Sequence, residues 1–209
     1  MWSILLAVIS AYLLGSIPNG FLIGRARGVD IRTVGSKNIG ATNVFRTLGK
    51  PLGILCFILD ALKGWLAVYL AVLINNGEVI GPDLAGIFGA IFGILGHNFT
   101  PWLGFKGGKG IATSAGALIS LVPWITVMIL IVWGIVFSIT RYVSLASICA
   151  SAALAILALI QKLTLGGISW WMVGFATVAA ALAIWRHKAN IQRLMAGTES
   201  RFTRKSTKS

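Results

Sequence analysis

The stretch with the clearest chemical character is residues 96–113, which lies between two strongly apolar runs. Its centre, residues 104–110, holds four glycines and two lysines. Glycines allow tight turns and a close approach of the backbone to a ligand, and the apolar run that follows would present a helix N-terminus. The stretch therefore predicts a site for a phosphate or another anion. Its candidate ligands are Lys106, Gly107, Gly108, Lys109 and Gly110.

The spacing excludes a nucleotide-binding P-loop, because glycine follows Lys109 where that motif requires Ser or Thr. The remaining alternative is a flexible loop whose charge serves only membrane topology. His97 lies near the end of the preceding apolar run. It is a candidate ligand or catalytic group, and equally a structural hydrogen-bonding residue.

A second polar segment, residues 28–46, interleaves hydroxyls, amides and cations with glycines. Such donors beside an arginine form phosphate sites. If residues 41–47 are helical, Thr42 and Arg46 lie one turn apart on one face. A capped turn between helices is the alternative, but it would not need this density of polar groups. The candidate ligands are Ser36, Asn38, Thr42, Asn43 and Arg46.

The third polar segment is residues 186–199. On a helix that continued through it, Arg186, Asn190 and Arg193 would lie within about 60° of arc, with His187 beside them. Arg186 alone is explained by a stop-transfer charge, but the stripe as a whole is not. We therefore take His187, Asn190 and Arg193 as candidate site residues.

Two charged residues, Asp60 and Lys63, stand three positions apart inside an apolar run. Charges at membrane depth are costly and face a bundle interior or water. They form a structural pair, or Lys63 reaches a ligand nearer the end of the span; the sequence leaves both open.

Carboxylates are scarce in this chain, which has 5 Asp and Glu against 18 Lys and Arg. This balance suits a multiply anionic substrate and offers neither paired carboxylates for acid–base chemistry nor a metal site. Cys56 and Cys149 both lie in apolar runs, so a disulfide framework is not supported. We expect no metal site.

The composition is that of a membrane protein, since 57% of the 209 residues are hydrophobic and 11% are charged. A soluble domain carries about 25% charged residues. The apolar residues come in long blocks, which predicts one all-α integral membrane domain over 1–209 with a polar, flexible tail at 197–209. A net charge of +13 would suggest nucleic acid for a soluble protein. Here the basic residues flank the apolar runs, so topology and anionic ligands explain it better.

The apolar runs determine the expected topology. Pro123 interrupts the long run 111–139 and is expected to divide it into two short helices. With that division, a compact bundle of seven spans places every Lys and Arg except Lys63 and Lys162 on the cytoplasmic side. The N-terminus is then external and the C-terminus cytoplasmic. The runs are 2–24, 52–74, 84–103, 111–139, 143–163 and 168–185.

Taken together, the three polar segments resemble those of the bacterial integral-membrane glycerol-3-phosphate acyltransferases that use acyl phosphate, the PlsY type. Residues 29–43 are similar to the first motif of that family, and Gly96-His97 with 105–113 to the second. Arg186-His187, Asn190, Arg193-Leu194 and 197–199 are similar to the third, and residues 141–148 fit the penultimate span. Lys37 stands where the family usually has glycine, which puts the backbone geometry there in question.

The resemblance implies a seven-span fold in the bacterial plasma membrane, with the active site facing the cytoplasm. It implies transfer of a fatty acyl group from acyl phosphate to the 1-hydroxyl of sn-glycerol 3-phosphate, yielding lysophosphatidate and phosphate. The implied partners are the two substrates, the lipid bilayer and, transiently, the soluble enzyme that makes acyl phosphate. The resemblance implies no metal and no organic cofactor.

We assign roles on that basis. One phosphate would bind the glycine-rich segment with Lys106, Lys109, Ser36 and Arg46. The second phosphate and the glycerol hydroxyls would bind Asn38, Thr42, Asn43, His187, Asn190 and Arg193. The base is His97, His187 or a phosphate oxygen of the substrate.

Two other functions remain open at this point. A transporter of an anionic metabolite would also have broken helices and polar residues within the membrane. A scaffold that binds anionic lipid would also have basic loops.

Overall fold

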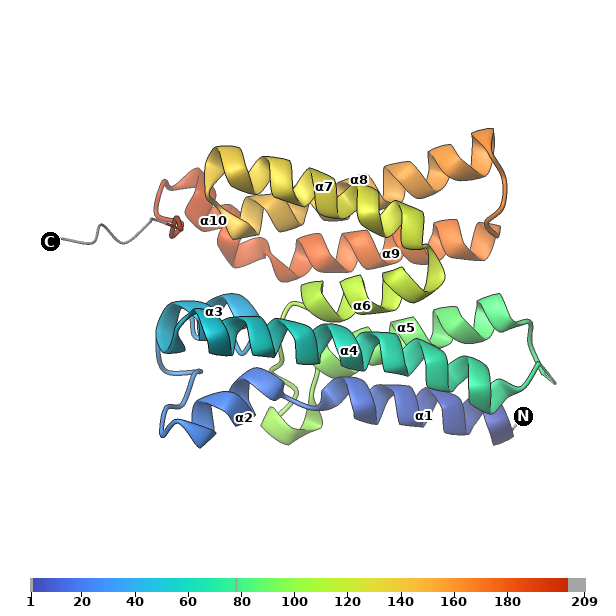
Figure 1. The fold of residues 1–209 in the computed structure, drawn as a ribbon, viewed down its shortest axis with the longest axis horizontal. Coiled ribbons are helices and arrows are strands. Elements are labelled where there is room, and N and C mark those ends of the chain that lie inside the picture. Colours follow the sequence, from blue (N-terminus) through green and yellow to red (C-terminus); the bar gives the residue numbers. More distant parts are fainter. Residues whose placement is uncertain (1, 78, 203–209) are drawn as a thin grey trace, which may run out of the picture.

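The computed structural model describes residues 2–77 and 79–202, and every regular element in them is helical (Figure 1). This confirms the all-α prediction for the described part of the chain. The helices are α1 (Trp2–Ser16), α2 (Asn19–Ala26), α3 (Ala41–Leu48), α4 (Lys50–Asn75), α5 (Pro82–Asn98), the 3-10 helix η1 (Pro101–Leu103), α6 (Ile111–Leu121), α7 (Pro123–Thr140), α8 (Val143–Thr164), α9 (Trp170–Arg186) and α10 (Lys188–Met195).

Five segments of the described part are long and apolar enough to cross a membrane, namely Trp2–Ala26, Lys50–Asn75, Pro82–Leu103, Pro123–Thr140 and Val143–Thr164. Helices α6, with 11 residues, and α9, with 17, are shorter. At 1.5 Å per residue, α6 extends only about 16 Å. The predicted break at Pro123 is confirmed, because α6 ends at Leu121 and α7 begins at Pro123. The count of seven spans stays a prediction.

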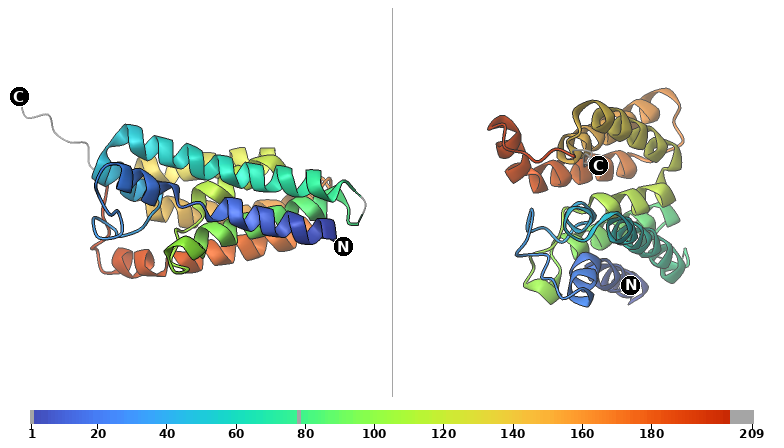
Figure 2. Two further views of the ribbon diagram at one scale, coloured as in Figure 1. Left: turned by 90° about the horizontal axis from the view of Figure 1, so that it is seen from below. Right: turned by 60° about the vertical axis from the view of Figure 1, so that its left-hand side comes forward.

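The helices pack in two groups (Figure 1). In the first group α4 contacts α1, α5 and α6, and α5 also contacts α1 and α6; α7, α8 and α9 form the second group. Contacts of α6 with α7 and of α5 with α9 join the groups. The short helices α2, α3 and α10 lie together at the end of the bundle opposite the N-terminus (Figures 1 and 2). The bundle therefore has one end that carries the irregular, polar segments.

Glycines set the close spacing within the first group. A Cβ atom at Gly116 of α6 would overlap the backbone of Ala61 in α4, and one at Gly64 of α4 would overlap the backbone of Thr113 in α6. Small residues at helix contacts let backbones approach closely, which favours association in a bilayer where the hydrophobic effect between helices is weak. This spacing brings the start of α6 against the middle of α4.

The buried apolar residues form two clusters. The larger one includes Val68, Leu118, Ile125 and Phe175 and joins both helix groups. The smaller one holds Ile31, Ile39, Val44 and Cys56, and it fixes the segment before α3 against α4. The loop 27–40 is therefore anchored by its own buried side chains.

We expect Gly116→Ala to destabilise the protein by about 1–3 kcal/mol, as overpacking of a tight contact does. For a chain of this size that is a fall of roughly 2–12 °C in the unfolding midpoint in detergent. Gly134→Ala in α7 is the matched control, because a Cβ there meets no atom within 4 Å. Equal midpoints for the two variants would contradict the close α4–α6 packing.

Candidate active site

The three polar segments meet at the end of the bundle that carries α2, α3 and α10, as the sequence predicts. They surround a cavity of about 500 Å³. The predicted site residues that line it are Ser36, Asn38, Thr42, Asn43, Arg46, His97, Lys109, Gly110, His187, Asn190 and Arg193. The four others, Lys63, Lys106, Gly107 and Gly108, are not among the residues that line it.

A chain of polar contacts runs through the cavity wall. The Lys109 ammonium donates a hydrogen bond to Asn190 Oδ1, and Asn190 Nδ2 donates to Glu199 Oε1 at 2.7 Å. The same carboxylate accepts from Ser144 Oγ and from Arg193 Nε, each at 2.7 Å. The contacts join the loop before α6 to α8, α10 and the C-terminal segment.

Burial changes the ionisation of the groups in this chain of contacts. Burial lowers the pKa of Lys109 to about 8. The negative charge of Glu199 acts in the opposite direction, and repulsion from nearby arginines lowers the pKa further; these are Arg193, Arg186 and Arg46. Burial alone would raise the pKa of Glu199, but the hydrogen bonds from Ser144, Asn190 and Arg193 lower it. At neutral pH the cavity therefore holds a cationic Lys109 and an anionic Glu199.

The surroundings of His187 hold its imidazole neutral, with the hydrogen on Nδ1 and the lone pair on Nε2. Its Nδ1 lies 2.8 Å from the carbonyl oxygen of Ala183, and a carbonyl can only accept, so Nδ1 carries the hydrogen. Burial and the neighbouring Lys109 lower the pKa of His187 to about 4. The Nε2 atom is therefore left with a free lone pair in a ring that lines the cavity.

The glycine-rich stretch has a different role from the one predicted. The Gly107 N–H bonds to Asn98 O and the Gly108 N–H to His97 O, each at 3.1 Å, so neither is free for a phosphate. Their carbonyls accept from the Arg186 guanidinium, at 3.0 Å for Gly107 O and 3.1 Å from Nε to Gly108 O. Gly107 and Gly108 thus hold the shape of the loop, and Lys106 beside them is exposed to solvent.

The N-terminus of α6 borders the cavity directly. Gly110 adopts a φ of 78° that favours glycine, and Ile111 and Ala112 line the cavity after it. The first hydrogen bond of this turn runs from Ser114 N to Gly110 O at 2.7 Å. The N–H groups before Ser114 have no partner within the helix, so they can bind an anion.

Asn43 organises the loop before α3 rather than extending toward a ligand. Its amide donates to the carbonyls of Ile31, Val34 and Asn38 at 2.9–3.1 Å and accepts from Ser36 N at 2.9 Å. These bonds use its hydrogen-bonding capacity, so the predicted contact with substrate is not supported. Lys37 has a φ of 57°, the conformation that the family's usual glycine would adopt without strain.

The third segment does not continue as one helix, so that part of the prediction is wrong. Helix α9 ends at Arg186, and α10 starts at Lys188 after the turn at His187. Arg186 therefore points to the glycine-rich loop, while Asn190 and Arg193 meet Glu199.

The tail that the sequence predicts to be flexible, 197–209, begins with a segment that contacts the site through Glu199, Ser200 and Phe202; 203–209 lie outside the described residues. Ser200 O accepts from Arg46 at 2.9 Å, and Phe202 N donates to Arg141 O at 2.9 Å. The Phe202 ring lies 4.7 Å from the Arg46 guanidinium and edge-on to Phe45. This segment bridges α3 to the α7–α8 corner.

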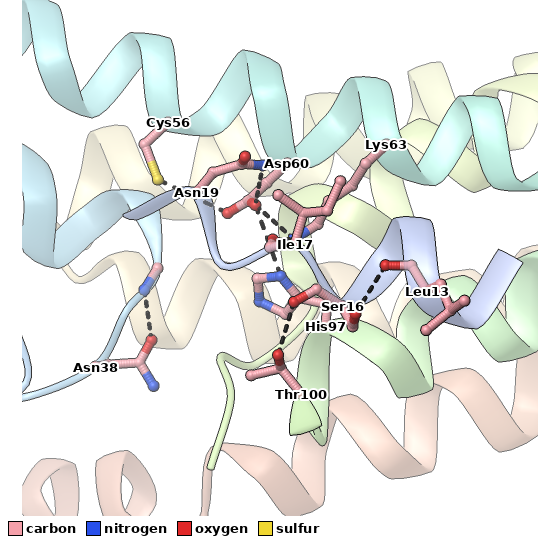
Figure 3. Close-up of polar contacts among 11 residues, drawn as sticks. Leu13, Ser16, Ile17, Asn19, Asn38, Cys56, Asp60, Lys63, His97 and Thr100 are labelled. Carbon is pink, nitrogen blue, oxygen red and sulfur yellow. Dashed lines mark hydrogen bonds and ion pairs between the residues drawn. The ribbon is translucent and has the colours of Figure 1, made fainter. Parts of the chain in front are cut away.

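Asp60 and Lys63 form the structural pair that the sequence left open, as Figure 3 shows. Lys63 Nζ lies 2.9 Å from Asp60 Oδ1 and donates to Ile17 O at 2.6 Å. Both side chains are buried, so Lys63 is occupied within the bundle. Lys63, Lys106, Gly107, Gly108 and Asn43 are therefore not retained as proposed ligands.

The sequence reasoning missed Glu199, Ser144, Ser147 and Trp133 as parts of the cavity wall. The signal for the serines was the likeness of residues 141–148 to the family's penultimate span. No local pattern pointed to Trp133, whose indole N–H donates to Ser147 Oγ at 3.1 Å.

Comparison with known proteins now decides the family. The family model of glycerol-3-phosphate acyltransferase matches residues 5–197. The chain belongs to this family. A Geotalea daltonii glycerol-3-phosphate acyltransferase is 45% identical over 98% of this chain and 100% of its own. One from Aquifex aeolicus is 43% identical over 95% of this chain and 98% of its own.

Solved structures agree with this family assignment. The crystal structure of PlsY, an integral membrane glycerol 3-phosphate acyltransferase, in its glycerol 3-phosphate form has a TM-score of 0.86 at 41% identity and covers 96% of both chains. Its lysophosphatidic acid form has a TM-score of 0.82 at 40% identity, with the same coverage. This acyltransferase family member is therefore a multi-pass membrane protein.

A pH dependence follows from Lys109. Its ammonium is present below about pH 8 and is lost above it, so kcat/KM for glycerol 3-phosphate should fall as the pH rises through that value. This ratio reports the free enzyme. In Lys109→Arg the cation persists, so the fall should move to higher pH even if the rate is lower. An unchanged alkaline limb in that variant would contradict the assignment to Lys109.

Proposed function

We propose that this protein transfers a fatty acyl group from acyl phosphate to the 1-hydroxyl of sn-glycerol 3-phosphate, forming lysophosphatidate and inorganic phosphate. The observation that carries the proposal is the cavity in which Lys109, Arg46 and Arg193 meet the N-terminus of α6. Cations and free backbone N–H groups around one space suit two phosphorylated substrates. The relatives' activity on glycerol 3-phosphate supports the acceptor.

The donor is inferred from what the cavity offers chemically. The Ser144 hydroxyl donates to Glu199, whose hydrogen bonds from Ser144, Asn190 and Arg193 lower its pKa, so this carboxylate is a weak base for activating a serine nucleophile. A donor that is already activated needs no enzyme nucleophile, so correct positioning of the two substrates supplies much of the rate. Acyl phosphate has this property, and its phosphate matches the cationic wall.

The reaction balances without an enzyme-bound intermediate. The glycerol hydroxyl oxygen forms a bond to the acyl carbon, the bond from that carbon to the phosphate oxygen breaks, and phosphate leaves. His187 Nε2 accepts the hydrogen bond of the attacking hydroxyl and orients it. Because the pKa of His187 is about 4 and the second pKa of a phosphate is about 6, the proton goes to the leaving phosphate. Lys109 and the α6 N-terminus stabilise the charge that develops.

The acyl chain would enter from the bilayer between the two helix groups. Phe57 of α4 and Trp133 of α7 both line the cavity, and Phe57 is 43% exposed. We place the polar end in the cytoplasm of a bacterial plasma membrane, because basic residues gather there. That side is also where the water-soluble substrate and the enzyme that supplies acyl phosphate would be found.

The test measures three variants of the purified protein, two at lysines of one loop and one at Asn190. Lys109→Ala and Asn190→Ala should lower kcat/KM by about 10- to 100-fold, since removing a hydrogen bond to a charged group costs about 1.5–3 kcal/mol. Lys106→Ala is the matched control and should keep the wild-type rate, because Lys106 is exposed outside the cavity. Equal losses at Lys106 and Lys109 would contradict the site.

The donor is tested with the same preparation. Lysophosphatidate should form from acyl phosphate and glycerol 3-phosphate, with release of one phosphate per product. Product formed with acyl-CoA or acyl carrier protein, and not with acyl phosphate, would overturn the proposed donor while leaving the acceptor assignment intact.

A further inference from the structure

The carboxylate of Asp60 lies at membrane depth and is contacted from three helical segments (Figure 3). Asn19 at the start of α2 donates to its Oδ1 at 3.0 Å, and Lys63 of α4 pairs with the same oxygen at 2.9 Å. His97 of α5 turns its Nδ1 toward this oxygen at 3.7 Å. Asp60 is 2% exposed, yet it lines the cavity, whereas Lys63 does not.

His97 is held between this carboxylate and the cavity. Its Nδ1 is fully buried and has no hydrogen-bond partner among the described residues. On its other side the ring meets the loop, where a Cβ at Gly108 would overlap Nε2. The ring is 4% exposed and belongs to the cavity wall. In Figure 3 one ring nitrogen faces Asp60 and the other faces away from it.

The electrostatics of this arrangement determine where the imidazole hydrogen lies. An ionised carboxylate can only accept, so the hydrogen is favoured on the nitrogen that faces Asp60. The other nitrogen then keeps its lone pair. Lys63 balances the charge of Asp60, so the pair presents an oriented dipole to His97.

We propose that Asp60 is a positioning residue that holds His97 in the tautomer with hydrogen on Nδ1, so that Nε2 accepts a hydrogen bond from a hydroxyl of the bound substrate. The inference rests on the proposed function, in which the acceptor substrate carries two hydroxyls. The Nε2 atom of His187 accepts a hydrogen bond from one of these hydroxyls. The tautomer of His187 is set by the backbone carbonyl of Ala183, which takes the place that the carboxylate has at His97. Asp60 thus contributes to recognition of the acceptor from inside the membrane.

The competing explanation is that Asp60 only neutralises Lys63. Asp60→Asn alone cannot separate the two, because it leaves a buried ammonium unpaired, which is strongly destabilising by itself. The double variant D60N/K63M removes both charges and keeps an acceptor for Asn19. An amide at position 60 can also donate to Nδ1, which permits the opposite tautomer.

The first measurement is steady-state kinetics of D60N/K63M, with its unfolding midpoint in detergent as the check on folding. The KM for glycerol 3-phosphate should rise about 3- to 10-fold, the usual effect of one lost neutral hydrogen bond, with a smaller change in kcat. In a His97→Ala background the same double substitution should have no further effect. Wild-type kinetics in D60N/K63M, or fully additive losses with His97→Ala, would overturn the proposal.

The second measurement does not depend on turnover. The chain has two histidines, so ¹⁵N-histidine labelling gives two imidazoles, and His187→Gln assigns them. His97 should carry its hydrogen on Nδ1 in the wild type and lose this preference in D60N/K63M. A wild-type His97 with hydrogen on Nε2 would overturn the proposal even in an active enzyme. Absence of turnover with every donor would instead count against the proposed function.

Discussion

The polar end of this molecule depends on the hydrogen bonds that the Glu199 carboxylate accepts from three side chains. Lys109, Arg46 and Arg193 lie around one cavity and repel one another. Glu199 offsets that repulsion, and its three hydrogen bonds join Ser144 of α8 to Asn190 and Arg193 of α10. An anionic anchor with several donors is a strong contact at low local dielectric. It allows a cationic site to remain assembled before any anionic substrate arrives.

A second constraint is the membrane, which requires backbone polar groups to be satisfied within the protein. Where helices are interrupted, side chains donate hydrogen bonds to the backbone carbonyls that are left without a helical partner. Lys63 satisfies Ile17 O where α1 gives way to α2, and Thr100 donates to Ser16 O at 2.7 Å beside it. Arg186 satisfies the carbonyls of the glycine-rich loop. Lys63 and Arg186 are residue types that often bind substrates, but here they donate hydrogen bonds to the backbone.

Two histidines with similar surroundings illustrate how local and distant contacts can lead to the same chemistry. His187 obtains its orientation from Ala183, four residues earlier in the chain. His97 faces a carboxylate 37 positions away in the sequence, so its partner is known only once α4 and α5 are packed. In both cases a buried acceptor faces Nδ1, and the ring belongs to the cavity wall.

The helical membrane class, the helix break at Pro123 and the gathering of three polar segments at one end could all be predicted from the sequence. These follow from apolar run length, proline geometry and the distribution of charge, which are local properties. The sequence also led to 11 of the 25 residues that line the cavity, Lys109, His187 and Asn190 included. Which polar groups face the cavity depends on how the helices pack and could not be predicted. In the packed bundle Lys63 pairs with Asp60, and the N–H groups of Gly107 and Gly108 bond to other backbone carbonyls. Arg186 bonds to the glycine-rich loop, whereas Asn190 bonds to Glu199. The reason is that a side chain's partner depends on helix rotation and crossing, which the close glycine contacts set over long distances in sequence.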